Sequence, residues 1–345
     1  MIMLERIAVG VVGIGFGQQV HVPAFRSDGR CQVVGICAST LDRARGVAAR
    51  LDIPRYYGDW REIATDPGID VLAIAVPPTL QAQIVSAAAA AGKHVFCEKP
   101  VAADAAQARD MLRAVEAARV AHAVDFIFPE IGAWKTAQRI LREGSLGDIR
   151  HVALSWRIET YAHRAKLDSW KLRREDGGGT LNGFVSHSLH YLEWLLGPVA
   201  RVAARLTPAG APGDARVDAW LEFASGVPGN VAVAADAFLG PGHCLEVYGE
   251  HGTLVRENRT PDHAAGFTLA VGTRRDATLA RLAVADGAGT ASDGRTLATA
   301  AIARRLLDAL VAGIPVAPNL RDGLRVQTLI DAVRAADSSG AWQDV

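Results

Sequence analysis

The sequence predicts an α/β protein of two domains: a doubly wound parallel sheet, followed by an α+β domain with a large, open, mostly antiparallel sheet. The chain has 345 residues, which is enough for two domains of ordinary size. Its first third alternates short apolar runs with helical stretches, as in a parallel sheet covered on both faces. Its later part has longer runs in which apolar and polar residues alternate, as in antiparallel sheets.

The strands of the first domain are predicted from apolar runs at 7–12, 32–37, 71–76, 94–97 and 121–126. Helical stretches between them lead up to Ser27 and cover 42–51, 80–91 and 105–118. Pro77 and Pro78 stop the third strand, and Gly92 follows an Ala-rich helix where a left-handed cap is favoured. We set the first domain at 1–121 and the second at 122–345, and leave open whether the C-terminal helices pack back on the first.

The second domain is predicted to begin with a helix at 134–143. Its strands are expected at 149–160, 199–206, 216–223, 230–237, 244–248 and 253–257, with a helix at 186–196 beside the sheet. A loop rich in Gly, Ala and Asp at 283–294 precedes two amphipathic helices at 297–312 and 321–336. The alternation leaves one sheet face uncovered, so we predict a homodimer or homotetramer through that face.

Composition narrows the class of protein. Lys and Arg number 37 against 37 Asp and Glu, so no excess of positive charge points to nucleic acid or an anionic membrane. No run reaches the length of about 20 apolar residues that a membrane span needs. The first residues do not resemble a signal peptide. The 4 cysteines show no C-x-x-C spacing. We therefore expect a cytoplasmic protein that handles small molecules.

A glycine-dense turn follows the first predicted strand and leads into the first helix. Glycine lets a backbone approach a pyrophosphate, and free N–H groups at a helix start stabilise its charge. The G-x-G-x-x-G fingerprint is imperfect, because Gln18 holds the third glycine's place. An ordinary tight turn is the alternative reading, but the βαβ context favours a dinucleotide site. The candidate cofactor residues in this turn are Gly13, Gly15, Phe16 and Gly17.

The end of the second strand bears on which dinucleotide binds. NAD enzymes usually carry an acidic residue there, which binds the ribose 2′-hydroxyl. This chain has Ser39 and Thr40 instead, and Arg43 follows, where it can pair with a 2′-phosphate. Asp42 is interpreted as a helix-start residue. We predict NADP(H) as the favoured cofactor, with NAD(H) possible and a solvated helix arginine as the alternative for Arg43. Pro77, after the third strand, joins the candidate cofactor set.

Several segments in a fixed order carry a family resemblance. The fourth strand ends in Cys97-Glu98-Lys99-Pro100; a G-G-G-T-L segment at 177–181 is followed by His187; and similar signatures occur at 245–254 and 338–342. Together they resemble the Gfo/Idh/MocA (glucose–fructose oxidoreductase and inositol dehydrogenase-like) family over nearly the whole chain. The resemblance implies a Rossmann domain, then an open-sheet domain. It also implies nicotinamide-dependent oxidation or reduction at a sugar, inositol or related polyol.

The resemblance also implies roles for particular residues. Lys99 would contact the reacting hydroxyl and His187 would serve as acid or base, since imidazole titrates near neutrality. From its place beside Lys99, Glu98 is interpreted as orienting Lys99 or touching the nicotinamide ribose, and Glu98 and Lys99 both count as candidate cofactor residues. Two positions depart from the family: Gly183 and His190 stand where members often have Asp. The candidate substrate residues are Lys99, Trp156, Arg157, Trp170, Asn182, His187 and His190.

The segment from Trp156 to Asp176 is rich in basic and aromatic residues. One hypothesis is a substrate loop for an acidic or nucleotide-linked sugar; a solvated loop or subunit contact is an equal alternative. The segment contains Arg157, Tyr161, His163, Arg164, Lys166, Trp170, Lys171, Arg173 and Arg174.

Two further readings concern metal and reaction class. His187, His190 and Glu193 have roughly the spacing of ligands on one helical face, but Glu193 drifts round the helix, so we expect no metal. An NAD-dependent glycosidase of the same family and a non-catalytic NADP(H)-binding regulator are the alternatives to an oxidoreductase. Net hydrolysis without cofactor turnover would identify the first, and binding without turnover the second.

Overall fold

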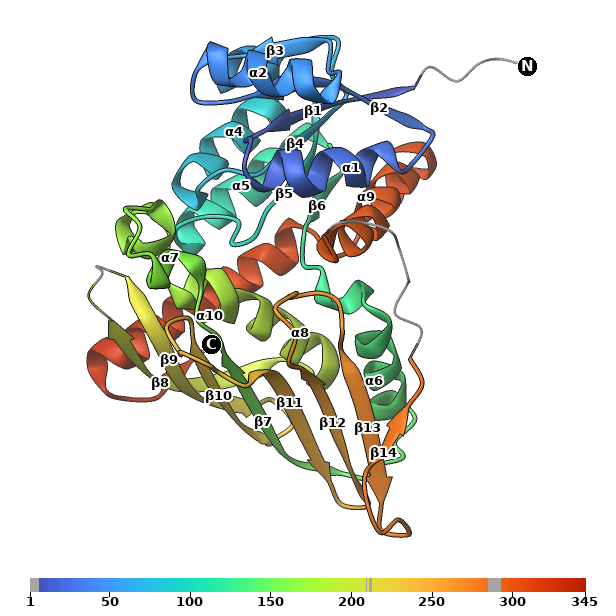
Figure 1. The fold of residues 1–345 in the computed structure, drawn as a ribbon, viewed down its shortest axis with the longest axis vertical. Coiled ribbons are helices and arrows are strands. Elements are labelled where there is room, and N and C mark those ends of the chain that lie inside the picture. Colours follow the sequence, from blue (N-terminus) through green and yellow to red (C-terminus); the bar gives the residue numbers. More distant parts are fainter. Residues whose placement is uncertain (1–5, 209, 211–212, 285–292) are drawn as a thin grey trace. The chain divides into compact units, whose positions relative to one another are not determined.

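The computed structural model describes residues 6–208, 210, 213–284 and 293–345. They form two compact units, which Figure 1 shows as ribbons. The first unit contains the described residues up to Ile127 and those from 293 to Gln327. The second unit begins at Phe128, runs through the second sheet, and ends with residues Thr328–Val345. Each unit is described by itself below.

The first unit is built on a six-stranded parallel sheet in the order β3-β2-β1-β4-β5-β6. Strand order reverses between β1 and β4, and in open α/β sheets ligands bind outside the carboxyl ends of strands at such a point. The short β3 was not predicted, because its residues R-Y-Y lack an apolar run, and the α3 helix was not predicted either. The strands are β1 (Ile7–Val12), β2 (Cys31–Cys37), β3 (Arg55–Tyr57), β4 (Val71–Ile74), β5 (His94–Cys97) and β6 (His122–Val124).

Capping residues fix the ends of several helices of the first unit. Thr40 accepts a hydrogen bond from the N–H of Arg43, and Asp104 accepts one from Gln107, so both residues cap helix starts. Gly92 adopts the left-handed conformation expected of it, with φ of 73°. The helices are η1 (Gly17–His21), α1 (Val22–Arg26), α2 (Leu41–Leu51), α3 (Trp60–Thr65), α4 (Pro78–Ala90), α5 (Ala105–Ala118) and α9 (Arg295–Ala312).

Helix α9 completes the core of the first unit, although it lies far along the chain. Its Ile302 and Leu306 are fully buried in one cluster with Val9, Phe25 and Phe96. Helix α10 (Leu320–Ser339) follows; its first residues belong to the first unit and the rest to the second. The core of the first unit therefore draws on residues that we had placed after residue 121.

The second unit contains a nine-stranded sheet in the order β14-β13-β12-β11-β7-β10-β9-β8-β15, seen as a broad fan in Figure 1. Its strand pairs are antiparallel except β7 with β10. The strands are β7 (Ile149–Arg157), β8 (Val199–Pro208), β9 (Asp214–Phe223), β10 (Pro228–Ala234), β11 (Gly242–Gly249), β12 (Gly252–Asn258), β13 (Thr268–Thr273), β14 (Ala280–Leu282) and β15 (Gln343–Asp344).

Burial alternates along these strands, as the sequence pattern predicts. In β9, Val217, Ala219 and Leu221 are buried, whereas Asp218 and Trp220 face outward. Helix α6 (Gly132–Arg142) packs on β12 and β13, and α8 (Ser186–Leu196) packs beside η5 (Leu181–Val185). The strands β13 to β15 were not predicted. The predicted loop at 283–294 includes 285–292, which lie outside the described residues.

Two further properties concern the described residues only. None of their helices combines the length and hydropathy required to cross a bilayer. Cys31, Cys37 and Cys97 are free and buried, and Cys244 is free and partly buried.

Candidate active site

The glycine turn after β1 has the geometry of a dinucleotide-binding turn. Gly13 has φ of 106°, and a Cβ there would lie 2.1 Å from the carbonyl oxygen of Ala75, so only glycine fits. A Cβ on Gly15 would meet nothing within 4 Å, which leaves an open approach to the backbone. A Cβ on Gly17 would lie 2.9 Å from Val11, so this glycine serves close helix–strand packing. Those are the three roles that the glycines of the fingerprint fulfil.

The edge beside β2 carries a cationic side chain instead of an acid. Ser39 and Thr40 are exposed after the strand, and Nη1 of Arg43 donates to Oγ of Ser39 at 2.7 Å. Asp42 is exposed and pairs with Arg45 at 3.4 Å, one helical turn on. The carboxylate nearest in sequence therefore faces solvent on the helix, and Arg43 lies beside the end of the strand.

The turn after β5 holds Lys99 between two anchored neighbours. The N–H of Glu98 donates to the carbonyl of Ile74 at 3.0 Å. The fully buried Gln81 amide donates to the carbonyls of Glu98 at 2.7 Å, Pro100 at 3.2 Å and Val101 at 2.9 Å. Lys99 itself is half-buried. Its backbone is therefore fixed, and the strand places it at the carboxyl edge of the same sheet as the glycine turn.

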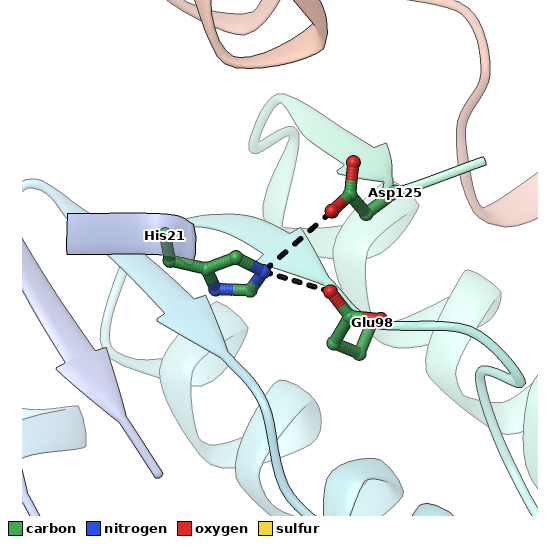
Figure 2. Close-up of side chains that lie close together, drawn as sticks. All are labelled: His21, Glu98 and Asp125. Carbon is green, nitrogen blue, oxygen red and sulfur yellow. Dashed lines mark hydrogen bonds and ion pairs between the residues drawn. The ribbon is translucent and has the colours of Figure 1, made fainter. Parts of the chain in front are cut away.

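A buried histidine lies against the side chain of Glu98 (Figure 2). Nε2 of His21 is 2.8 Å from Oε1 of Glu98 and 3.8 Å from Oδ2 of Asp125, which follows β6. Oγ1 of Thr299, on α9, donates to Asp125 at 2.8 Å. Burial lowers the pKa of His21, but the nearby carboxylates of Asp125 and Glu98 outweigh the effect of burial and raise that pKa to about 9. Burial raises the pKa of Asp125, and the nearby imidazole of His21 opposes that shift.

The same three side chains are the group of potential metal ligands found among the described residues. The 2.8 Å separation of Nε2 from Oε1 is an ordinary hydrogen-bond distance, and a charge-assisted bond explains the arrangement without an ion. This group differs from His187, His190 and Glu193, whose spacing we had weighed for a metal. We interpret it as a hydrogen-bonded cluster.

The predicted acid–base residue of the second unit lies on helix α8. His187 is 8% exposed, and its ring stands edge-on to Phe128 at 4.9 Å. His190 follows one turn later and is half-buried; burial lowers its pKa to about 3, so it is neutral at ordinary pH. A Cβ on Gly183 would meet nothing within 4 Å, so there is open space at this position, where the family resemblance implies a carboxylate.

The glycine run before α8 forms a tightly fixed loop. A Cβ on Gly178 would lie 2.2 Å from the carbonyl of Trp170, and Asp214 accepts the N–H of Leu181 at 2.6 Å. Asn182 is fully buried: its Nδ2 donates to Gly177 at 2.9 Å, and its Oδ1 accepts from Arg334 at 3.1 Å. In this structure the amide of Asn182, a predicted substrate residue, is engaged within the protein.

Phe128, which contacts His187, lies at the centre of a group of aromatic side chains. Phe128 lies within 6.0 Å, centroid to centroid, of six other rings. Trp156, a predicted substrate residue, is 3% exposed and stacks on His243 at 4.3 Å with an interplanar angle of 1°. We call this group the aromatic cluster; it comprises Phe128, Trp134, Trp156, His187, Tyr191, His243 and Phe267.

The predicted basic segment folds into α7 (Tyr161–Arg164), η3 (Trp170–Leu172) and η4 (Arg174–Asp176). Arg173 is neutralised within it, since it pairs with Asp176 at 2.6 Å and with Asp168. Trp170 is partly buried, and the exposed cations are Arg157, Arg164, Lys166, Lys171 and Arg174.

Sequence reasoning did not select His21, Gln81, Asp125 or Thr299. One signal was present: His21 lies four residues after Gly17 on the helix that begins at the glycine turn. Asp125 is a carboxylate inside a predicted apolar strand, and such a residue needs a partner. Nothing in the sequence pairs these two residues, because their approach depends on strand order.

Comparisons with known proteins agree with the fold and indicate the family. Residues 7–126 match the family model described as an oxidoreductase family with an NAD-binding Rossmann fold, and residues 134–255 match the GFO/IDH/MocA C-terminal domain. An uncharacterised oxidoreductase of Synechocystis is 29% identical, with 97% of this chain and 95% of that protein covered. Levoglucosan dehydrogenase of Pseudarthrobacter phenanthrenivorans is 26% identical, with 99% of each covered. A solved structure of levoglucosan dehydrogenase with NADH and L-sorbose is 25% identical, with a TM-score of 0.88 and 99% of each chain covered.

Proposed function

The chain belongs to the Gfo/Idh/MocA oxidoreductase family, and on that premise we propose that it transfers hydride between a nicotinamide dinucleotide and a hydroxyl or ketone of a sugar or polyol. One observation carries the proposal: the glycine turn and Lys99 follow β1 and β5 at the carboxyl edge of one parallel sheet. That edge, at the point where strand order reverses, is where a bound dinucleotide and a reacting group meet in such sheets.

Each residue of the proposed site has a distinct task. The open backbone at Gly15 and the helix start at Gly17 bind the pyrophosphate. The ammonium of Lys99 donates a hydrogen bond to the reacting oxygen and stabilises negative charge that develops on it. His187 accepts the hydroxyl proton in oxidation and returns it in reduction. The nicotinamide, when bound, supplies the hydride acceptor or donor.

For the substrate, we propose a sugar or polyol. Levoglucosan dehydrogenase, a relative along its full length, is named for a sugar derivative. With Gly183 and the neutral His190, this site has fewer carboxylates than the family resemblance implies. Exposed Arg and Lys side chains also occur along the segment 157–174. This charge pattern suits an acidic sugar, or one linked to a nucleotide.

Substitution of Lys99 by alanine tests the proposal. We expect kcat to fall by about 10³-fold while dinucleotide binding persists, because a donor to the developing oxyanion is lost. Lys93→Ala, at the amino end of the same strand, is the matched control and should retain turnover. Unchanged turnover in Lys99→Ala contradicts the proposal. Net hydrolysis of a glycoside without net cofactor reduction would favour the glycosidase alternative.

For the cofactor, we propose a preference for NADP(H) over NAD(H). Support comes from the Ala38-Ser39-Thr40 sequence at the end of β2, which has no acid at the strand end, and from Arg43 beside Ser39. Arg43→Ala should weaken NADPH binding by about tenfold or more, as expected for one charge-assisted contact to phosphate, and leave NADH binding unchanged. Arg45→Ala, two residues on and also exposed, is the control. Equal affinity of the unaltered protein for both nucleotides rejects the preference.

We also propose a homodimer or homotetramer through the open face of the second sheet. Trp220 and Trp342 are 54% and 43% exposed there, and they line a hollow of about 330 Å³ with His151 and Asp218. Large exposed aromatic side chains on a sheet face mark interaction surfaces. Light scattering should give a molar mass in solution that is a multiple of 36.5 kDa, and Trp220→Glu should lower that molar mass. A monomer mass at all concentrations contradicts the proposed oligomer.

For the location, we propose the cytoplasm. The four free cysteines support this proposal, because thiols stay reduced there.

A further inference from the structure

We propose that His21 is a positioning residue that links the glycine turn to the turn at Glu98–Pro100 and so holds Lys99 in its working position. The inference rests on the proposed function, because Lys99 is the group that is placed. His21 would touch neither substrate nor cofactor. It would act through Glu98, the neighbour of Lys99 in the chain.

The ring of His21 is held on both sides. It stands edge-on to Phe16 at 5.4 Å and to Phe96 at 5.1 Å, and the residue is fully buried. Phe16 belongs to the glycine turn, and Phe96 lies in β5, two residues before Glu98. Interiors are close-packed, so a displacement of Phe16 is transmitted to the imidazole.

The imidazole of His21 holds the carboxylate of Glu98, the third group of this residue that is restrained by a hydrogen bond. The N–H of Glu98 is bound by Ile74 and its carbonyl by Gln81, and neither bond restrains the carboxylate. His21 restrains it, through Nε2 at 2.8 Å (Figure 2). With the carboxylate, the N–H and the carbonyl of Glu98 all held, and with Pro100 bound by the same Gln81, the backbone on either side of Lys99 has little freedom.

Charge strengthens this link. The charged groups facing His21 are Glu98 after β5 and Asp125 after β6; Arg295 on α9 lies beyond Phe16, 4.8 Å from its ring centroid. The two carboxylates raise the pKa of His21 to about 9 despite its burial, so the imidazole is protonated near neutral pH. A protonated donor on a carboxylate gives a charge-assisted bond, which is shorter and stronger than a neutral one.

The first test replaces the hydrogen bond without removing the ring. His21→Phe keeps an aromatic side chain between Phe16 and Phe96 and deletes Nε2. We expect kcat to fall by about 10- to 100-fold, as misplacement of a catalytic group by about 1 Å does. The Kd of the preferred dinucleotide should stay the same. His94→Phe is the matched control, because His94 accepts a hydrogen bond from the N–H of Ala121 at the opposite end of β5; it should leave kcat unchanged.

A second variant keeps the test decisive if His21→Phe does not fold. Glu98→Gln leaves the packing of His21 intact and removes the charge at the other end of the bond. If His21 acts through Glu98, Glu98→Gln alone should lower kcat by about 10- to 100-fold. Where His21→Phe folds, the double variant should lose no more kcat than either single variant, since both substitutions break one link. Additive losses overturn the inference.

A third measurement needs no turnover. In ¹⁵N-histidine NMR spectra of the full chain, His21 should titrate on the alkaline side of neutrality, and Glu98→Gln should move its midpoint to lower pH. An unmoved midpoint overturns the inference. Full kcat in His21→Phe, together with an inactive Lys99→Ala, also overturns the inference. That result leaves the proposed function intact. Absence of turnover by the unaltered protein on any sugar or polyol counts against the proposed function, and the NMR titration then decides the inference alone.

Discussion

His21 in the first unit and His243 in the second are buried almost equally, but their pKa values are shifted in opposite directions. His21 is 0% exposed and His243 3% exposed. His21 faces two carboxylates, and its pKa is raised to about 9. His243 stacks on Trp156, and burial, with the charge of Arg256, lowers its pKa well below its usual value. Burial alone always disfavours the imidazolium; the neighbouring charges decide the sign of the net shift.

The two surroundings also differ in what stabilises them. Around His21, a few directed polar interactions, with Glu98 and Asp125, stabilise the arrangement. The second is the aromatic cluster, where Arg256 lies 3.1 Å from the ring centroid of Trp134 and 4.1 Å from that of Phe267. Its energy comes from burial of large apolar surface and from ring geometry. Disruption of each should therefore have a different size and a different pH dependence.

The largest effect is expected in the aromatic cluster. Phe128→Ala should lower the free energy of unfolding by about 3–5 kcal/mol, the usual cost of deleting a fully buried aromatic side chain. Urea unfolding at several pH values should give the same loss throughout, since no proton is involved. Phe238→Ala, at a residue 76% exposed, is the control. A loss below about 1 kcal/mol would show that Phe128 is not central to packing.

The next effect concerns His21 and alkaline pH. Its folded-state pKa of about 9 exceeds the ordinary value of 6.5, so its contribution is fully present below pH 6.5 and is lost as pH rises through 9. The shift corresponds to about 3 kcal/mol at 1.36 kcal/mol per pKa unit. The unaltered protein should lose this stability between pH 6.5 and pH 9, whereas His21→Gln should show a flatter profile. Parallel profiles would contradict the assignment.

For His243, the free energy of unfolding should depend on pH in the opposite direction. Its folded-state pKa is lowered, so its contribution is present above pH 6.5 and is lost as pH falls below that value. The protein should therefore be less stable at pH 5 than at pH 7, because the unfolded chain then holds a proton that the folded chain excludes. His243→Phe should remove this part of the acid sensitivity, measured by urea unfolding at pH 5 and pH 7. An unchanged difference between these pH values would reject it.

The smallest effect is expected at an exposed ion pair. Arg30 and Asp308 approach to 2.6 Å, closer than His21 and Glu98, but their side chains are 40% and 49% exposed. Solvent and salt screen such pairs, so Asp308→Asn should change the free energy of unfolding by less than about 1 kcal/mol. A loss as large as that of the buried pair would mean that distance, and not burial, governs these interactions.

The sequence predicted much of the fold because local pattern carries it. Apolar runs marked five of the six strands of the first sheet, and residue spacing marked the glycine turn. It missed β3, whose three residues carry no apolar run, and β13 to β15. The Glu98–Lys99–Pro100 turn was selected from family resemblance, and its anchor Gln81 was not, because a buried glutamine in a helix has no distinctive sequence signal.

The sequence by itself therefore determined which local elements form and which turns carry chemistry, since these depend on neighbours in the chain. Only the tertiary structure decided that His21, Glu98, Asp125 and Thr299 meet, and that α9 completes the first core. These residues come from four separate segments. Their approach depends on strand order and helix packing, and the energy of their interaction depends on a burial that no single segment creates.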